Sequence, residues 1–410
     1  MLPRSHSKAL DGLKRLVDRK RLTRIVYMHA DHFEPWRRGI TQRNADNLVA
    51  FGEAVAKTAF SRKLSLFYKP WVAYAFAKDP GAAPHIEGEP IVFRPHTDAE
   101  ADIARRALRE LLRTGEHEIN LHIHHEGFTS SGVRRNAAIA GWLAANSGPA
   151  ADAKRFELYL QLSLAAARDD TGLALERWAF VHGAWALNGS DHSICRIPSE
   201  IGILQRNGCF GDFTFPAGRA HVNPKIKHPF TCLPVVCDRA YDRPEAKPRI
   251  VVPASGAFVP GHFFIWSSAI GAGHCSIDYH DPEILRNLAD STRAAFRLIA
   301  ASVHFDGTVY VKTHSHSMAG EYWESVRKAV APHLHANVRS VLSQIAEFAA
   351  KLGLALEFAT ASTVVDEFVR KSAPDYAARA PTPQARRRPE ILISRSWKSR
   401  IRVRRALVLD

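Results

Sequence analysis

Residues 118–125 read Glu-Ile-Asn-Leu-His-Ile-His-His, and this alternation of polar and apolar side chains predicts a β-strand. His122 and His124 lie two residues apart, so both imidazoles project from the same face of that strand. Two imidazoles held in this way can bind one transition-metal ion, and a carboxylate from another strand would complete a site with open positions for water. The stretch therefore predicts a metal site as well as a strand.

Short apolar runs alternate with longer helical patterns on both sides of this strand, a rhythm typical of βα units. Asp98 is the expected N-cap of its helix, and Gly353 the residue that ends the last long helix. The fold class predicted is α/β. The strands are expected at 24–29, 64–76, 118–125, 177–182, 212–215, 249–252, 308–313 and 354–359, and the helices at 44–60, 98–113, within 132–170, and at 198–207, 283–302 and 322–352.

Side chains that can act in catalysis or bind a metal follow the carboxyl ends of several of these strands. This is the face where β/α barrels form active sites. Asp31, at the end of the first expected strand, is the favoured carboxylate for the His122–His124 pair. His32 could instead be the third ligand and leave Asp31 as the general base, and the spacing does not decide between these roles. The expected cofactor is a divalent metal ion, with zinc as the first candidate.

A second histidine pair, His314 and His316, shares a face at the end of the strand expected at 308–313. Histidine titrates near neutral pH, so either imidazole could donate a proton to a leaving amine. A second metal site or plain surface polarity would give the same pattern. His182 and Asp212 are further catalytic candidates beside two other strands, although Asp212 could equally cap a turn.

Three polar or aromatic residues follow the strand that ends at His182, namely Trp185, Asn188 and Asp191. An aromatic ring can stack on the apolar face of a sugar, and polar side chains can bond its hydroxyl groups, so these residues are expected to bind substrate. Packing is the competing interpretation for Trp185. Glu200, near the start of an expected helix, suits helix capping as well as catalysis.

The bulk composition, 46% hydrophobic and 24% charged over 410 residues, is typical of a globular protein with a sizeable core. Five cysteines without a Cys-x-x-Cys pair argue against a disulfide scaffold and against a zinc site built from cysteine alone. Reduced thiols favour a cytoplasmic location. The sequence contains no apolar run of about 18 residues, as a membrane span needs, and its basic amino terminus lacks the apolar core of a signal peptide.

The formal charge of +15 is concentrated at the carboxyl terminus, where residues 371–410 hold 11 Lys and Arg against three acids. The remaining charge is modest, so nucleic acid is not an expected partner. The sequence predicts one barrel domain over 1–370 and a basic, flexible tail over 371–410. A solvated tail is the simpler interpretation, but the segment could also lie against an anionic membrane at the inner face.

Five blocks of the chain together resemble the polysaccharide deacetylase superfamily, and more narrowly a branch of deacetylase-like proteins associated with cell-surface polysaccharide synthesis. The resemblance spans roughly residues 24–365 and keeps the order of the blocks. They are HADHFEP (29–35), EINLHIHH (118–125), FVHGAWALNGSD (180–191), CRIPSEIGILQRNGCFGDFTFPA (195–217) and VYVKTHSHS (309–317).

The resemblance implies a distorted (β/α)₇ barrel that holds Zn²⁺ or a similar ion through one Asp and two His. It also implies an Asp as base, a late His as acid, and hydrolysis of an N-acetyl group on a sugar or polysaccharide. The family has Asp-Asp where this chain has Asp-His, and wider spacing between its two histidines. By position, Asp31-His32 matches the paired-aspartate motif, His122 and His124 the two-histidine motif, Arg196-Ile-Pro198 the Arg-x-Pro block, Asp212 the fourth block, and His314 or His316 the late histidine.

Two other interpretations of the same residues stay open. A metal phosphoesterase or an amidohydrolase also uses His-x-His pairs on barrel strands, usually on the first strand. A catalytically inactive relative that binds carbohydrate or a membrane would also fit the altered motifs.

Overall fold

The computed structural model describes most of the chain up to residue 372. The described residues are 4–36, 39–56, 63–75, 91–93, 96–125, 148–191, 194–195, 197, 199–218, 220–234, 250–251, 258–259, 261–276, 290–316, 318 and 330–372. They belong to one compact unit, Met1–Ala373. Arg196 and nearly all of the expected basic tail lie outside the described residues, and Lys371 and Ser372 end a helix.

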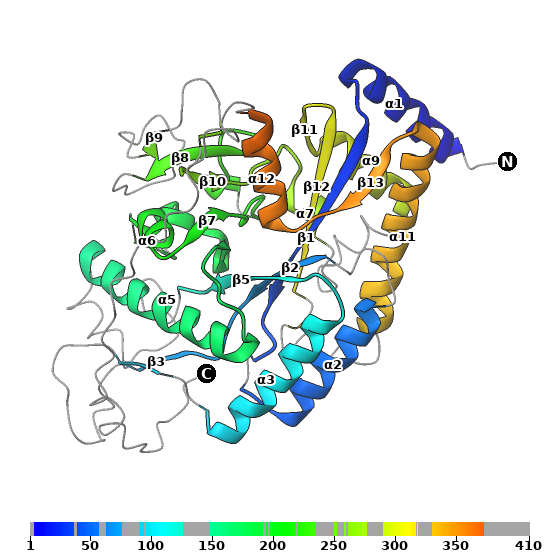
Figure 1. The fold of residues 1–410 in the computed structure, drawn as a ribbon. Coiled ribbons are helices and arrows are strands. Elements are labelled where there is room, and N and C mark those ends of the chain that lie inside the picture. Colours follow the sequence, from blue (N-terminus) through cyan, green and yellow to red (C-terminus); the bar gives the residue numbers. More distant parts are fainter. Residues whose placement is uncertain are drawn as a thin grey trace. The chain divides into compact units, whose positions relative to one another are not determined.

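One mixed β-sheet forms the centre of an α/β fold, as the sequence predicts (Figure 1). Its central strands are parallel, and β11, β8 and β9 pair antiparallel at the two edges. The order is β11 (Val303–Phe305), β12 (Thr308–Ser315), β1 (Arg24–Phe33), β2 (Leu64–Tyr68), β5 (Glu118–Ile123), β6 (Trp178–His182), β7 (Cys209–Asp212), β10 (Phe263–Ile265), β8 (Phe230–Pro234) and β9 (Ile250–Val251), with β13 (Ala355–Phe358) also beside β1.

The sheet curls, and a bridge between Ser276 and His314 brings the chain after β10 to β12. Across the described residues no strand ladder joins β10 or β9 to β12 or β11, so a closed seven-stranded barrel is not confirmed. A separate two-stranded ribbon is formed by β3 (Ala73–Ala75) and β4 (Ile91–Phe93).

Helices cover the outer face of the sheet, with α2 beside α3, α3 beside α5, and α9 beside both α1 and α11 (Figure 1). No helix in the described part of the chain is both long and apolar enough to cross a membrane. The α-helices are α1 (Arg4–Lys20), α2 (Gln42–Ala56), α3 (Asp98–Arg113), α5 (Pro149–Thr171), α6 (Glu200–Arg206), α7 (Ala272–Cys275), α9 (Ser291–Ala301), α11 (Val330–Leu352) and α12 (Ala361–Ser372), and the 3₁₀ turns are η3 (Gly183–Trp185), η4 (Leu187–Gly189) and η5 (Ala220–Val222).

The two faces of the sheet bury two different apolar clusters. On β1, Val26, Met28 and Ala30 face the concave interior and pack with aromatic side chains of β7, β10 and α12. The alternate residues Ile25 and Tyr27 face outward and pack under the helices. Because side chains alternate along a strand, this pattern fixes the face on which every later residue of β1 lies.

Helix α12 fills the amino end of the concave interior. Its Phe368 packs against the Tyr310 ring at a tilt, with centroids 4.5 Å apart, and the Tyr310 hydroxyl donates to Glu367 at 2.6 Å. Arg24, at the start of β1, also bonds Glu367. The amino end is therefore packed, which leaves polar side chains to gather at the carboxyl end of the strands.

Several element boundaries differ from those expected from the sequence. Strand β1 continues to Phe33 because His32 and Phe33 still pair with β2. Thr97, rather than Asp98, caps α3: its hydroxyl accepts from the backbone N–H of Glu100, whose carboxylate accepts from Thr97 N at 2.6 Å. Asp212 ends β7 instead of beginning a strand. Gly353 follows α11 with a φ of +66°, so its predicted role in ending that helix is confirmed.

Candidate metal centre

Strand alternation brings histidines from three distant parts of the chain into the concave interior. His32 continues the inward-facing series of β1, His122 lies on β5, and His314 lies on β12 two residues after the inward-facing Lys312. The His32 ring centroid lies 5.0 Å from that of His122 and 5.4 Å from that of His314. The predicted convergence at the carboxyl ends of the strands is thus found for these residues.

The carboxylate that meets the predicted histidine pair belongs to Glu34. Its Oε1 lies 2.7 Å from His124 Nε2 and 3.1 Å from His122 Nε2. Glu34 and His122 are fully buried, whereas the His124 side chain is 28% exposed. The group is therefore closed on the protein side and open to solvent at one position.

Asp31 is not brought to the histidine pair, which corrects the assignment favoured from the sequence. It lies one residue from His32 on β1 and consequently on the outward face. There its Oδ1 accepts a hydrogen bond of 2.7 Å from the Ser315 hydroxyl, which also lies 2.9 Å from His29 Nε2. Glu34 replaces it because residues 32 and 34 continue the same inward-facing alternation past the end of the strand.

The hydrogen bonds of His122 fix which of its nitrogens faces the carboxylate. Nδ1 lies 3.0 Å from the carbonyl oxygen of Val181, which can only accept, so Nδ1 carries the proton. Nε2 then presents a lone pair, and its contact with Glu34 lacks hydrogen-bond geometry. Burial lowers the pKa of His122 to about 4, more than Glu34 raises it, so the ring is neutral at neutral pH.

The charge and the lone pairs of these groups would suit a cation. Burial raises the pKa of Glu34, but Lys69, His124 and His122 together hold it well below its usual range, so the carboxylate is charged. Lone pairs of Glu34 and His122 face each other 3.1 Å apart, close to the ~3.4 Å between two ligand atoms of a tetrahedral zinc ion. A carbonyl bonded to the second ring nitrogen is also usual for histidine ligands of metals. The three residues could therefore hold one divalent ion.

Next to this group lies a second set of imidazoles. His32 Nδ1 is 3.0 Å from His316 Nε2, and the two rings meet edge to face. His32 Nε2 is buried and makes no hydrogen bond. Burial, and then His316, His122 and His314, lower the pKa of His32 well below its usual value. His32 is therefore a neutral base beside the candidate metal group, while the half-buried His316 connects it toward solvent.

Lys312, which the sequence reasoning did not select, is buried in the interior two residues before His314. Its ammonium group donates to the carbonyl of Phe215 at 2.7 Å and to that of Phe213. Burial lowers the pKa of Lys312 to about 8. These hydrogen bonds connect β12 to the chain after β7, and the ammonium group places positive charge near the histidines.

Two predicted catalytic residues lie on the outward face instead. His182 ends β6 and stacks on His125, with ring centroids 4.0 Å apart. Asp212 is fully buried, and its carboxylate accepts from the Thr214 hydroxyl at 2.7 Å and the Thr214 backbone N–H at 3.0 Å. The structure thus does not place either side chain beside His122, and Asp212 acts as the turn cap that the sequence analysis kept as its alternative.

The three expected sugar-binding residues lie in a loop with unusual backbone geometry. Trp185 and Asn188 have φ angles of +65° and +53°. Asn188 is buried, and its Oδ1 accepts from the Ile201 N–H at 3.2 Å, so it supports the start of α6 rather than facing a ligand. Asp191 pairs with His221 at 3.0 Å. A sugar contact from the partly exposed Trp185 stays a prediction.

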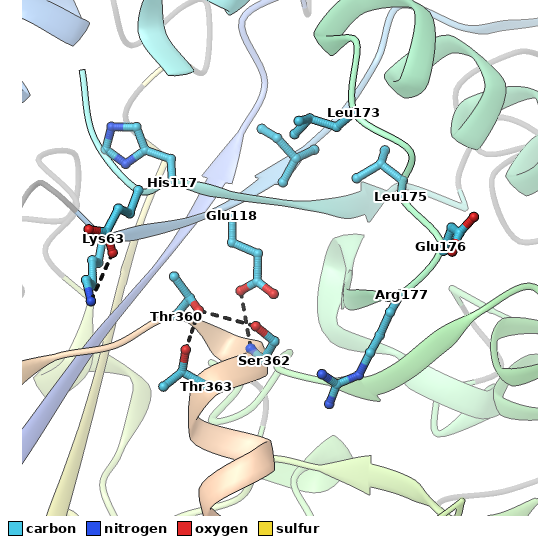
Figure 2. Close-up of a pocket in the computed structure, with 12 residues that line it drawn as sticks. Lys63, His117, Glu118, Leu173, Leu175, Glu176, Arg177, Thr360, Ser362 and Thr363 are labelled. Atoms are coloured by element: carbon cyan, nitrogen blue, oxygen red, sulfur yellow. Dashed lines mark hydrogen bonds and ion pairs between the residues drawn. The ribbon is translucent and has the colours of Figure 1, made fainter. Parts of the chain in front are cut away.

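A cavity of about 410 Å³ lies at the opposite, amino end of the strands (Figure 2). Glu118 at the start of β5 accepts from the Ser362 N–H at 3.2 Å there, and Lys63 pairs with Glu116 at 3.0 Å. Arg177, just before β6, also lines it. Parallel α/β sheets bind ligands at the carboxyl ends of their strands, so we assign no catalytic role to this cavity.

Comparisons of the chain with protein-family models, curated proteins and solved structures found no match. The interpretation of the site consequently depends on its own geometry. Glu34 was the residue missed by the sequence reasoning, although it lies within the quoted block 29–35. Counting by two from His32 would have found it.

Proposed function

We propose that this protein is a metal-dependent hydrolase of the polysaccharide deacetylase type, which removes N-acetyl groups from a polysaccharide or its sugar precursor. The observation that carries the proposal is the convergence of Glu34, His122 and His124 at the carboxyl end of a mostly parallel sheet, with further imidazoles beside them. On this proposal the curled sheet is a distorted (β/α)₇ barrel.

Glu34, His122 and His124 would hold the divalent ion, with Zn²⁺ favoured by the imidazole ligands. When bound, the ion would supply Lewis acidity that polarises the acetyl carbonyl and makes a water more acidic. Three protein ligands leave at least one coordination position open, which separates a catalytic arrangement from a closed structural one. The exposed edge of His124 marks the side from which substrate would enter.

His32 is the residue best placed to take a proton from the attacking water. Its Nε2 is unbonded, the ring is neutral, and it lies beside His122. This differs from the family pattern, in which an aspartate is the base, and it follows from the outward position of Asp31. His316, in contact with His32 and half-buried, or His314 would return a proton to the leaving amine.

The test is acetate release from oligosaccharides of N-acetylglucosamine by the full-length protein. We expect release by the zinc-loaded protein, loss after chelation, and recovery when zinc is restored. His122→Ala should bind less metal and release no acetate. His304→Ala, at a histidine of the edge strand β11 beside the amino end of β12, is the matched control and should keep metal content.

Other substrates distinguish the alternative functions. Hydrolysis of p-nitrophenyl phosphate without acetate release would favour the phosphoesterase interpretation. Glycan binding with metal content but no hydrolysis of either substrate would overturn the enzymatic proposal and favour the inactive relative. A protein that binds no divalent metal at Glu34, His122 and His124 would contradict both enzymatic functions.

A further inference from the structure

A second group of metal-ligating side chains lies on the outward face of the same strands. His125 follows β5, His182 ends β6, Glu200 begins α6, and Cys195 lies in the chain between them. All four residues have 0% exposure. Phe156 of α5 stacks on the His125 ring at 4.8 Å and helps to cover the group. We call these four residues the outer cluster.

The ligand atoms of the outer cluster lie close to one another. His125 Nε2 lies 2.8 Å and His182 Nε2 lies 3.7 Å from the same Glu200 oxygen, Oε1. One nitrogen, sulfur or oxygen atom from each of the four residues lies within 4.8 Å of all the others. The two imidazole planes are inclined by only 4°, so the two rings stack in parallel. This spacing suits four ligands around one tetrahedral ion.

The carboxylate of Glu200 gives independent support for a bound cation. Its Oε2 accepts from the Asn188 N–H at 2.5 Å, but its fully buried Oε1 makes no hydrogen bond and points into the cluster. A buried carboxylate oxygen without a hydrogen bond is costly unless a charge compensates it.

The sulfur of Cys195 is the fourth candidate ligand atom. The backbone N–H groups of Ile197 and Gly189 donate hydrogen bonds to it. Amide donors aimed at sulfur stabilise the thiolate, which is the form that binds metals. A set of two imidazoles, one thiolate and one carboxylate favours zinc over magnesium or calcium.

We propose that the outer cluster is a structural metal site, in which His125, His182, Cys195 and Glu200 bind one Zn²⁺ ion in a closed shell. All four positions are supplied by the chain and none is open to solvent, as structural zinc sites require. The site joins the ends of β5 and β6 to the start of α6. His125 adjoins His124 in the chain, so the ion would also fix the segment that presents His124 to the interior.

The first test is the metal content of the full-length protein after zinc loading and removal of free metal. We expect two equivalents for the wild type, one for Cys195→Ser, one for His122→Ala, and none for the double variant. The inner and outer sites are thus counted separately. Loss of activity in His122→Ala with one equivalent retained would leave the outer cluster supported whatever the reaction is.

The second test uses Co²⁺ in place of zinc, because a thiolate bound to cobalt gives a charge-transfer band in the near ultraviolet. The wild type and His122→Ala should show this band, and Cys195→Ser should lose it. Cys232→Ser, at another buried cysteine outside the cluster, is the matched control and should keep it. If Cys195→Ser does not fold, the wild type still decides, since absence of the band there would overturn the proposal. A band that survives in folded Cys195→Ser would also overturn it.

Discussion

His124 and His125 are neighbours in the chain, but they belong to two clusters on opposite faces of the sheet. The inner cluster of Glu34, His122 and His124 has one partly exposed ligand, His124, and further imidazoles beside it. The outer cluster contains a thiol and lies wholly under α5 and α6. The difference shows that access and surrounding groups, rather than residue type, separate a candidate catalytic centre from a structural one.

The two faces differ because of what covers them. Among the described residues, α12 packs into the amino end of the concave face, and polar side chains gather at its carboxyl end. The outward face is packed under helices along its length. Two histidines that are neighbours in the chain, such as His124 and His125, therefore lie in an open and a closed environment.

The largest effect is expected when the inner carboxylate is neutralised. Glu34→Gln removes the only charged ligand proposed for the inner ion, so activity should fall to the background rate and one metal equivalent should be lost. Asp31→Asn keeps its acceptor for Ser315 and should retain both metal and most activity. Acetate release and metal analysis of the two variants check this. The opposite ranking would restore Asp31 as the ligand.

A smaller loss is expected from the imidazoles that handle protons. We expect His316→Ala or His314→Ala to lower kcat by about 10²- to 10⁴-fold, the usual contribution of general acid–base catalysis, with metal content unchanged. His32→Ala should remove the corresponding limb of the pH–rate profile. Profiles recorded for all three variants assign the roles, and an unchanged profile in each would exclude these residues from proton transfer.

A change in the packing between the clusters should affect the inner site alone. A Cβ atom at Gly183 would lie 2.5 Å from Cγ of His124 and 2.7 Å from two further ring atoms, so Gly183→Ala must displace that ring. We expect inner metal affinity to fall by roughly 10- to 100-fold, as for lost supporting contacts. Titration with zinc measures it. The cobalt–thiolate band of the outer site should stay, and its loss would show that the two sites are not separable.

The smallest effect concerns the pH dependence of stability near the outer cluster. Asp212 accepts a hydrogen bond from the Thr214 hydroxyl, which in turn accepts from the backbone N–H of His182 at 2.8 Å. Burial raises the pKa of Asp212 from 3.8 to about 7, so the folded state keeps a proton that the unfolded state has lost.

This contribution to stability is present below pH 3.8 and is lost as the pH rises to about 7. The free energy of unfolding of the wild type should therefore fall across this pH window relative to that of Asp212→Asn. The slope against pH should correspond to at most one proton. Urea unfolding at several pH values measures the difference. Parallel pH dependence in the two proteins would contradict the raised pKa.

Much of the fold follows from local sequence patterns. The alternation at 118–125 predicts β5, and the βα rhythm predicts the α/β class with most of its strands and helices. The early end assigned to the first strand was wrong, because pairing of His32 and Phe33 with β2 is a tertiary contact that the local pattern does not contain.

What the sequence by itself determined is the pairing of residues two apart, His122 with His124 and His314 with His316, because strand alternation is a local property with period two. Only the tertiary structure decided which carboxylate meets each group. Glu34 is about 90 residues from His122, and Glu200 is 75 from His125, so their meeting depends on strand register and helix packing. Strand register and helix packing arise from the whole fold, so they produce no pattern at a fixed spacing in the sequence.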